Sequence, residues 1–272
     1  MHMDGNDTPL NTNPVALITG ASSGLGALFA RELARRGYDL LLVARRKDRL
    51  EALAVEIQSQ QPVAVEVFQT DLSNAEQLNR LEAHLSQLDR LEFLVNNAGF
   101  ATYGRFARVE PDKHIAMVNV HLVATVRLTR AALPGMLSRQ KGAIINVSSM
   151  SAFVPIGVGV VYGTTKAALV AFSQALSHEL RGSGVRVQAL CPGFIRTEFH
   201  ETPELKKFQR SSVPGFMWGN PETVVSDSFR ALEKGQVVCI PGGFYKFGSF
   251  FLRNQIFSPI IKLFIRWFYR RR

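Results

Sequence analysis

Short apolar segments alternate with longer segments of helical periodicity along most of this chain, and that alternation limits the possible folds most strongly. Strands are predicted at 15–19, 39–44, 63–68, 92–96, 143–148, 185–190 and 237–240. Helices are predicted from Leu25 to Leu33 and over 46–60, 74–88, 111–138, 161–182 and 221–234. Several strands are apolar almost throughout, which is typical of strands buried on both faces of a parallel sheet. We therefore expect an α/β fold with a doubly wound parallel sheet, in which ligands bind at the carboxyl ends of the strands.

The uncharged segment 142–165 raises the question of a membrane span, because it contains no Asp, Glu, Lys or Arg. Pro155 and three glycines at 157, 159 and 163 interrupt it, and its first part is a predicted buried strand. We therefore predict no span there. The chain has 272 residues, a length that suits one large α/β domain.

The first strand ends in TGASSGLG, Thr19 to Gly26, which places three glycines at the strand end and the start of the first helix. Glycines at such a turn let the backbone approach a pyrophosphate closely, and the helix N-terminus supplies N–H donors and a positive dipole end. A tight turn without a ligand is the simpler alternative. The position of the motif between the first strand and the first helix favours a dinucleotide site.

Two arginines, Arg45 and Arg46, follow the second strand, at the place where the adenosine ribose of a dinucleotide would lie. A carboxylate here would bind the ribose 2′-hydroxyl of NAD, whereas a cation accommodates the 2′-phosphate of NADP. No acidic residue follows the strand before Asp48. The sequence thus favours NADP(H) as the cofactor, with Arg45 expected to carry much of the preference. Solvated charges at a helix start are the alternative.

Tyr162 and Lys166 form an i, i+4 pair that shares one helix face if 161–182 is helical. An ammonium near a phenol favours the phenolate, so we expect the pKa of Tyr162 to fall below about 10. A tyrosine tuned in this way can donate a proton to a carbonyl oxygen or remove one from an alcohol. An isolated pair of this spacing would more simply be two amphipathic side chains. Here, however, the pair follows a dinucleotide-binding pattern.

Taken together, these segments resemble the short-chain dehydrogenase/reductase family in its single-domain form, over about residues 14–242. The resemblance rests on motifs in family order: TGASSGLG (19–26), DL (71–72), NNAG (96–99), VNV (118–120), SS (148–149), YGTTK (162–166) and PGFIRT (192–197). Each motif is weak alone, but the ordered set is specific. It implies a Rossmann-type three-layer domain and an NADP(H)-dependent oxidoreductase that interconverts a carbonyl compound and its alcohol.

The resemblance also implies roles for individual residues. Ser149 would hold the substrate oxygen, Tyr162 would act as the general acid/base, and Lys166 would lower the pKa of Tyr162 and bind the nicotinamide ribose. Asn119 would support a water-linked proton relay toward the lysine. The implied cofactor-binding set is Gly20, Ser22, Ser23, Gly24, Leu25, Gly26, Arg45, Arg46, Asp71, Leu72, Asn97, Ala98, Gly99, Tyr162, Lys166, Pro192, Gly193, Ile195 and Thr197.

Within that set, Asp71 and Leu72 would flank the adenine, 97–99 would lie on the adenosine ribose side, and Ile195 and Thr197 would meet the nicotinamide carboxamide. No family role matches the histidines, for which surface or core positions are expected: His84, His114, His121, His178 and His200. No metal site is expected, because the two cysteines, Cys191 and Cys239, do not have the spacing of metal ligands.

Residues 198–220 form a long insertion that would be the variable lid over the substrate. Its larger apolar residues would line a pocket for a lipophilic ketone or acyl-type substrate, or would pack as a lid without touching it: Phe199, Leu205, Phe208, Phe216, Met217 and Trp218. Lys206, Lys207 and Arg210 would meet an anionic handle such as CoA, or would remain solvated.

The net charge of +10 belongs mainly to the C-terminal tail. Eight of the 32 lysines and arginines, and no acidic residue, follow Glu233, which leaves 24 basic residues against all 22 acidic ones. That balance argues against a nucleic-acid partner. In the tail, Lys262, Arg266 and Arg270 form one cationic stripe on a predicted apolar helix that begins near Pro259. Such a helix fits an anionic membrane surface, or packs on the catalytic domain or a second subunit.

The expected organisation is a disordered lead-in (1–13), a Rossmann-type catalytic domain (14–245) and a basic amphipathic tail (246–272). The opening segment lacks the order of a signal peptide and the cysteines form no disulfide framework, so we expect a cytoplasmic protein. A homodimer or homotetramer is expected from the family resemblance. Peripheral contact of the tail with the inner membrane surface is the open question. An NADP-binding regulator without turnover, or an NADP-dependent epimerase or dehydratase, remains the alternative function.

Overall fold

The computed structural model describes residues 13–154, 159–206 and 208–246, and these form one seven-stranded sheet in the order β3-β2-β1-β4-β5-β6-β7. Every neighbouring pair of strands is parallel. The strands are β1 (Val15–Thr19), β2 (Asp39–Ala44), β3 (Val65–Gln69), β4 (Leu91–Asn96), β5 (Gly142–Val147), β6 (Val185–Leu190) and β7 (Val238–Cys239). The order reverses beside β1, between β2 and β4, which defines the doubly wound α/β class predicted from the sequence.

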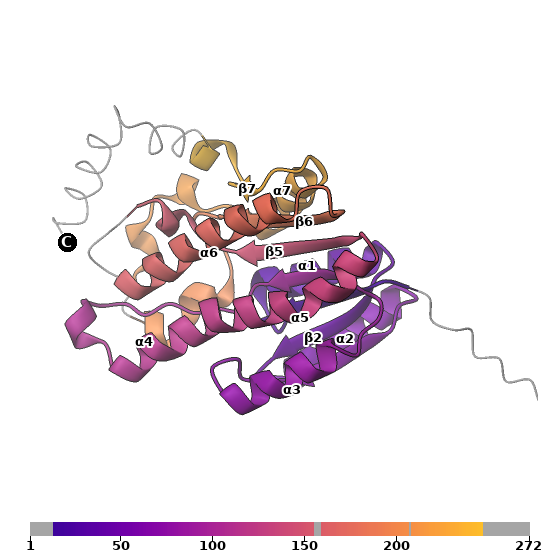
Figure 1. Cartoon of the computed structure of the whole chain (residues 1–272). Helices are drawn as coiled ribbons and strands as arrows, with labels where there is room; N and C mark the ends of the chain where they lie inside the picture. The colour runs from indigo at the N-terminus through magenta and orange to yellow at the C-terminus, as the bar shows by residue number, and fades with distance from the viewer. Residues whose placement is uncertain (1–12, 155–158, 207, 247–272) are drawn as a thin grey trace, which may run out of the picture.

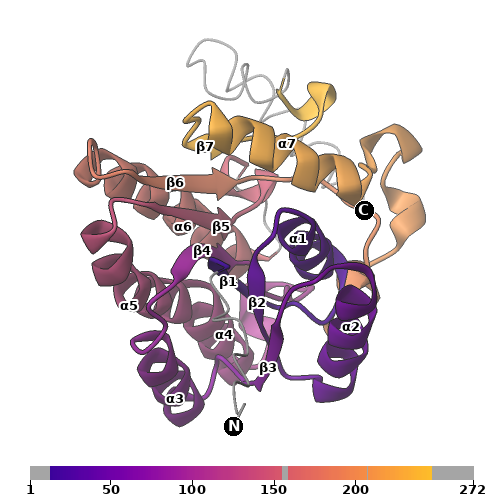
Figure 2. The same ribbon diagram turned by 90° about the vertical axis from the view of Figure 1, so that its right-hand side faces the viewer.

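Helices cover both faces of this sheet, so the molecule has three layers (Figures 1 and 2). One face carries α1 (Gly24–Arg35), α2 (Lys47–Gln60) and α7 (Pro221–Glu233). The other face carries α3 (Ala75–Leu85), α4 (Pro111–Val118), α5 (Ala124–Ser138) and α6 (Val160–Glu179). Because both faces are covered, the central strands can be apolar on both sides.

The two larger hydrophobic cores lie on opposite faces of the sheet, because side chains alternate along each strand. In β1, Ala16 and Ile18 belong to the core that includes Phe29 and Phe229, under α1 and α7. Leu17, between them, belongs to the core on the opposite face with Leu128 of α5. Full burial of a leucine or phenylalanine side chain stabilises the fold by about 1.5–3 kcal/mol. The run VALIT is therefore required to be apolar at every position that meets a core.

The predicted helix over 111–138 is interrupted. A π-helical segment, Asn119–Val123, separates α4 from α5. Short π segments are rare and are frequently found at functional sites, because they displace the side chains they carry from the regular helical face. Apolar periodicity did not reveal the break, since helical dihedrals continue on both sides of it. The segment carries Asn119, one of the predicted site residues.

The uncharged segment 142–165 contains β5, a connection and the start of α6, as the strand pattern predicts. Within 13–154, 159–206 and 208–246, no helix combines the length and the apolarity that crossing a membrane demands. The predicted lead-in, apart from Asn13, and all but the first residue of the predicted tail lie outside the described residues.

Candidate active site

The predicted site residues follow the carboxyl ends of six different strands. Gly20, Arg45, Asp71 and Asn97 come after β1, β2, β3 and β4 in turn, and Ser149 comes two residues after β5. Pro192 follows β6 in the same way. Because all of the strands are parallel, these positions meet at one edge of the sheet, the edge toward which the β5 arrow points in Figure 1.

The glycine-rich loop is packed too closely for side chains at two positions. Gly20 and Gly24 have φ angles of +65° and +55°, a region that favours glycine. A methyl group on Gly20 would lie 2.9 Å from the Cα of Ala98, and one on Gly26 would lie 2.2 Å from the carbonyl oxygen of Gly20. The loop therefore leaves its backbone bare at the start of α1, as a phosphate cradle requires.

The second loop of the cradle, 97–99, is fastened to the first by Thr19. The Thr19 hydroxyl accepts hydrogen bonds from the backbone N–H of Asn97 at 2.9 Å and of Ala98 at 3.0 Å. The Asn97 side chain donates to the carbonyl oxygens of Thr19, at 2.9 Å, and Gly20, at 3.2 Å. The two loops thus form one rigid unit above the ends of β1 and β4.

Arg46 reaches back across the start of α1. Its guanidinium donates to the hydroxyls of Ser22, at 3.0 Å, and Ser23, at 2.8 Å. Glu198 meets Arg46 at 3.4 Å and Arg49 at 2.7 Å, from the first turn of the predicted lid. Two cations, two hydroxyls and the Glu198 carboxylate thus converge at a partly exposed position beside the start of α1.

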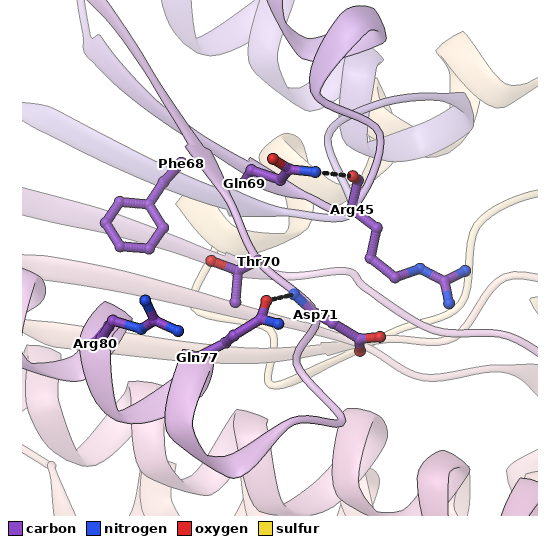
Figure 3. Close-up of a pocket in the computed structure, with 7 residues that line it drawn as sticks. All are labelled: Arg45, Phe68, Gln69, Thr70, Asp71, Gln77 and Arg80. Carbon is purple, nitrogen blue, oxygen red and sulfur yellow. Dashed lines mark hydrogen bonds between the residues drawn. The ribbon is translucent and has the colours of Figure 1, made fainter.

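Arg45, unlike Arg46, lines a cavity. A cavity of about 510 Å³ is bounded by Arg45, Phe68, Gln69, Thr70, Asp71, Gln77 and Arg80 (Figure 3). Gln69 donates to the Arg45 carbonyl oxygen at 3.0 Å, and the Asp71 backbone N–H donates to Gln77 at 2.7 Å. In Figure 3 the side chains of Arg45 and Asp71 point to the same side of this cavity. Leu72 is buried in the adjoining core.

Tyr162, Lys166 and Ser149 converge at the start of α6. Lys166 is 4% exposed, donates to the Val147 carbonyl oxygen at 2.8 Å, and lies 5.7 Å from the centroid of the Tyr162 ring. Burial lowers the pKa of Lys166 to about 8. Burial also raises the pKa of Tyr162 to about 12, and a hydrogen bond with Ser149 opposes that rise.

The expectation that Lys166 lowers the pKa of Tyr162 is therefore wrong for this arrangement. The ammonium is directed at a backbone carbonyl rather than at the phenol oxygen, and the loss of hydration destabilises the phenolate more than the Ser149 hydroxyl stabilises it. Ser148, beside Ser149, donates to the Lys166 carbonyl oxygen at 2.6 Å and so fixes α6 against β5. Asn119 is half-buried at the start of the π-helical segment.

The segment after β6 forms the remaining wall. Thr197 lies against Gly24, 3.4 Å from the position of an added methyl group, and Ile195 is buried in the core. The ring of Tyr245 occupies the space beside Gly193, and its hydroxyl accepts from the Phe194 backbone N–H at 3.1 Å. Only glycine fits at 193 for this reason. Ser22 and Ser23 lie in the glycine-rich loop, Leu25 and Gly26 in the first turn of α1, and Gly99 in the loop 97–99.

The described residues of the lid, 198–206 and 208–217, form four short 3-10 turns and no regular helix. His200 lies among the rings of Phe194, Phe199, Phe208 and Trp218, with ring centroids 5.0–5.9 Å from its own. Phe199 also contacts the Tyr162 ring at 6.1 Å. Burial, followed by the charge of Arg210, lowers the pKa of His200 to about 4. The lid thus presents a neutral aromatic cluster beside Tyr162.

Two of the residues expected in the lid, Phe216 and Arg210, have other contacts. Phe216 is 71% exposed and packs against Phe244, so it does not line the aromatic cluster. Arg210 donates to the Thr197 carbonyl oxygen at 2.7 Å and pairs with Glu201, so its contacts hold the lid segment together. Lys207 lies outside the described residues.

Sequence reasoning missed four residues that organise the site, Thr19, Ser148, His121 and Glu198. Thr19 and Ser148 lie at the ends of β1 and β5, within the motifs TGASSGLG and SS. Their position beside the predicted ligand-binding loops could have indicated their role. His121 lies two residues after Asn119, yet its hydrogen bonds are with the loop at Phe100 and with Thr165 of α6, both distant in sequence. Glu198 meets Arg46 across 152 residues of chain. No local pattern indicates such pairs.

The fold and this site define a class of protein. A doubly wound parallel sheet, a glycine cradle at its switch point, and a Ser, Tyr and Lys cluster at the same edge together fit a nicotinamide dinucleotide and a small carbonyl or alcohol. The cradle fits the dinucleotide because its glycines leave no space for side chains where the backbone must approach phosphates.

Comparisons with known proteins specify the family. A family model described as short chain dehydrogenase matches residues 14–207. The very-long-chain 3-oxoacyl-CoA reductase of Anas platyrhynchos is 34% identical over 236 residues, which cover 84% of this chain and 72% of that protein. A solved short-chain dehydrogenase from Sphingobium yanoikuyae, in complex with NADPH, is 36% identical with a TM-score of 0.78, covering 84% of this chain and 87% of that one.

A second solved structure is the bulky-bulky ketone specific alcohol dehydrogenase from Comamonas testosteroni, which is 32% identical with a TM-score of 0.74, over 84% of this chain and 86% of that one. The chain belongs to the short-chain dehydrogenase family. It is an oxidoreductase that uses a nicotinamide cofactor to interconvert a carbonyl compound and its alcohol.

Proposed function

We propose that this protein is an NADP(H)-dependent oxidoreductase of a lipophilic ketone or acyl-type carbonyl compound. The observation that carries the proposal is the meeting of Ser149, Tyr162 and Lys166 at the edge of the sheet that also holds the glycine cradle. Residues 14–245 would form the catalytic unit, with the lid over 198–220.

The proposed chemistry divides between the cofactor and the side chains. NADPH, when bound, supplies a hydride to the carbonyl carbon, and the reverse transfer oxidises an alcohol. Ser149 donates a hydrogen bond to the substrate oxygen. Tyr162, which burial keeps protonated, transfers its proton to that oxygen as the C–O single bond forms. Lys166 binds the nicotinamide ribose, and Asn119 supports the path by which Tyr162 regains a proton.

The preference for NADP(H) is assigned to the anion site around Arg46. A 2′-phosphate there would receive charge-assisted hydrogen bonds from the guanidinium and neutral ones from the hydroxyls of Ser22 and Ser23. The NADPH bound in the 36% identical relative supports this choice. Arg45 and Asp71 would then line the adenine cavity rather than the phosphate site. We therefore expect Arg46, rather than Arg45, to carry most of the preference for NADP(H) over NAD(H).

The substrate class follows from the lid. Aromatic rings from Phe199, Phe208 and Tyr103 approach Tyr162 or one another, and a neutral His200 adds no charge to that surface. An apolar wall of this kind favours lipophilic groups on the carbonyl compound. The names of two relatives, a very-long-chain 3-oxoacyl-CoA reductase and a bulky-bulky ketone specific alcohol dehydrogenase, support the same class. Lys206 remains an exposed cation available to an anionic handle.

The test is NADPH oxidation in the presence of a panel of ketones and 3-oxoacyl thioesters of increasing chain length. Turnover that rises with apolar size supports the proposal. NADPH binding without any turnover would favour a regulator, and conversion of a sugar nucleotide without net cofactor oxidation would favour an epimerase or dehydratase.

A matched pair of variants tests the chemistry in the same assay. Tyr162→Phe should lower kcat by at least about 10²-fold, because the proton donor is lost, while the Kd for NADPH changes little. Tyr103→Phe, which removes a phenol hydroxyl from an exposed ring, is the control and should retain activity. Substantial turnover by Tyr162→Phe would contradict the assignment.

We also propose that the protein self-associates. Val123, Val126 and Leu137 are each at least 40% exposed and recur along one side of α5 and the adjoining π-helical turn, a face suited to a second copy. The homodimer or homotetramer expected from the sequence would bury this face.

A further inference from the structure

His121 is a buried titratable residue at the candidate site that the proposed chemistry does not use. It is 1% exposed and lies in the π-helical segment Asn119–Val123. Its contacts reach two other segments, the loop 97–100 and the first turns of α6. Both segments belong to the proposed reaction, the loop through the cofactor and α6 through Tyr162.

The hydrogen bonds of the ring assign its tautomer. The Phe100 backbone N–H can only donate, and it lies 3.2 Å from Nε2, so Nε2 carries no proton. The proton is therefore on Nδ1, which donates to the Thr165 hydroxyl at 2.8 Å. That hydroxyl donates in turn to the Tyr162 carbonyl oxygen at 3.0 Å. One rigid ring thus connects the 97–100 loop to α6.

The ring is also packed between these segments. Its centroid lies 6.1 Å from that of Phe100 and 5.8 Å from that of Tyr162, with the edge of one ring toward the face of the other in both pairs. A methyl group on Gly99 would lie 2.8 Å from Nε2 and 3.5 Å from Lys166 Nζ. Glycine at 99 therefore lets the loop lie directly against the imidazole and the ammonium.

The charge state agrees with the geometry. Burial, and then the positive charge of Lys166, lower the pKa of His121 well below its ordinary value. A neutral imidazole has an acceptor at one end and a donor at the other, which is what the Phe100 N–H and the Thr165 hydroxyl require. An aliphatic residue of similar size would leave both polar groups buried without this partner.

We propose that His121 is a positioning residue that sets the separation between the cofactor loop 97–100 and the proton donor Tyr162. The inference rests on the proposed function, because it takes Tyr162 as the proton donor. It differs from the role of a core histidine that only stabilises the fold, since it predicts kinetic losses in fully folded protein. A misplacement of about 1 Å in reacting geometry can lower a rate by about 100-fold.

Two substitutions each retain one of the two hydrogen bonds. His121→Gln can still accept from the Phe100 N–H at the ε position but loses the donor to Thr165. We expect it to lower kcat about tenfold while the Kd for NADPH stays within about twofold of the wild type. His121→Asn retains a δ donor for Thr165 but loses the acceptor for the loop. We expect it to raise the Kd for NADPH about tenfold with kcat at saturating cofactor nearly unchanged.

The measurements are steady-state ketone reduction, fluorescence titration of NADPH, and the folded fraction from denaturant unfolding. A lower kcat in His121→Gln together with a higher Kd for NADPH in His121→Asn supports positioning. A general loss of stability would not change kcat in one variant and Kd in the other. Wild-type kcat and Kd in the folded fraction of both variants would overturn the inference, as would parallel losses that follow the unfolded fraction.

Thr165→Val removes the hydrogen bond between His121 and Thr165 from the side of Thr165. It keeps the shape of the side chain, removes the hydroxyl, and should reproduce the kcat loss of His121→Gln; an unchanged kcat would count against positioning. If the His121 variants do not fold, Thr165→Val alone tests whether His121 is a positioning residue.

Wild-type protein is assayed in parallel. A lack of wild-type turnover would contradict the proposed function. The NADPH titration of His121→Asn would still test the inference in that case.

Discussion

At the scale of single residues, the same burial moves the pKa values of Tyr162 and Lys166 in opposite directions. The pKa of Tyr162 is raised to about 12 and that of Lys166 is lowered to about 8, because a low-dielectric site disfavours the charged form of each group. Tyr162 is consequently a proton donor at neutral pH. Lys166 is protonated below pH 8, and its ammonium donates to the Val147 carbonyl oxygen at 2.8 Å.

The depressed pKa of Lys166 predicts how stability changes with pH. Below pH 8 the lysine is protonated in both states, and the buried ammonium destabilises the folded protein. Between pH 8 and about 10.5 the folded state releases the proton while the unfolded state keeps it, so stability rises with pH in this window. Urea unfolding of wild type and Lys166→Met at pH 8 and pH 10 should show a rise in the wild type that the variant lacks. Equal changes in both proteins would contradict the buried charge.

The anion site predicts the cofactor preference residue by residue. Arg46→Ala should remove a charge-assisted contact of about 1.5–3 kcal/mol and raise the Kd for NADPH about ten- to a hundredfold, with little change for NADH. Arg45→Ala is the matched control, since Arg45 lines the adenine cavity. Titration of both cofactors against the three proteins checks this. A larger loss of preference in Arg45→Ala would restore the assignment made from the sequence alone.

At the scale of elements, Glu198 joins the lid to the start of α2. This residue begins the first 3-10 turn of the lid and pairs with Arg46 and Arg49 at the start of α2. Arg46 also bonds to the serines at the start of α1. Three elements that are far apart in the chain therefore meet at one cluster of charges, and a phosphate at this cluster would compete with the carboxylate for the arginines.

That competition predicts the effect of Glu198→Gln. Removing the negative charge should lower the Kd for NADPH about two- to fivefold, the size expected for an exposed ion pair, and leave the Kd for NADH unchanged. The gain should shrink as salt is raised, because screening weakens exposed charges. Glu201→Gln, which removes a lid carboxylate paired with Arg210, is the control. A weaker NADPH affinity in Glu198→Gln would mean that the carboxylate supports the phosphate site.

At the scale of the whole molecule, charge is distributed unequally along the chain. Eight basic residues and no acidic residue follow Glu233, whereas basic and acidic residues nearly balance before it. The segment 247–272 lies outside the described residues, so its role stays a prediction from sequence. Each cation near an anionic membrane contributes about 1 kcal/mol of attraction, and Trp267 and Tyr269 suit the interface.

Deletion of 255–272 should therefore abolish binding to vesicles that contain anionic lipid and leave ketone reduction intact. Co-sedimentation of full-length and truncated protein at low and high salt makes the measurement, and salt should release the full-length protein. If the tail packs on protein instead, truncation would change the oligomeric mass or stability. Full-length protein that remains in the supernatant at low salt would contradict the membrane prediction.

Much of the architecture could be predicted because it depends on short-range patterns. The strands Val15–Thr19, Asp39–Ala44 and Val185–Leu190 have the predicted bounds, since an apolar run between turn residues fits only a strand buried on both faces. The last strand is shorter than predicted, with two residues, because only Val238 and Cys239 pair with β6. The break at Asn119–Val123 escaped prediction, because π and α turns share the same apolar residues.

The sequence by itself determined the fold class, the family and the order of the site motifs, because each depends on residues close together in the chain. The tertiary structure decided what those residues do electrostatically. Burial reversed the expected pKa shift of Tyr162. Contacts between distant segments placed Arg46 against Ser22 and Ser23, and His121 against α6. Dehydration and long-range contact are set by packing in three dimensions, and no spacing along the chain encodes them locally.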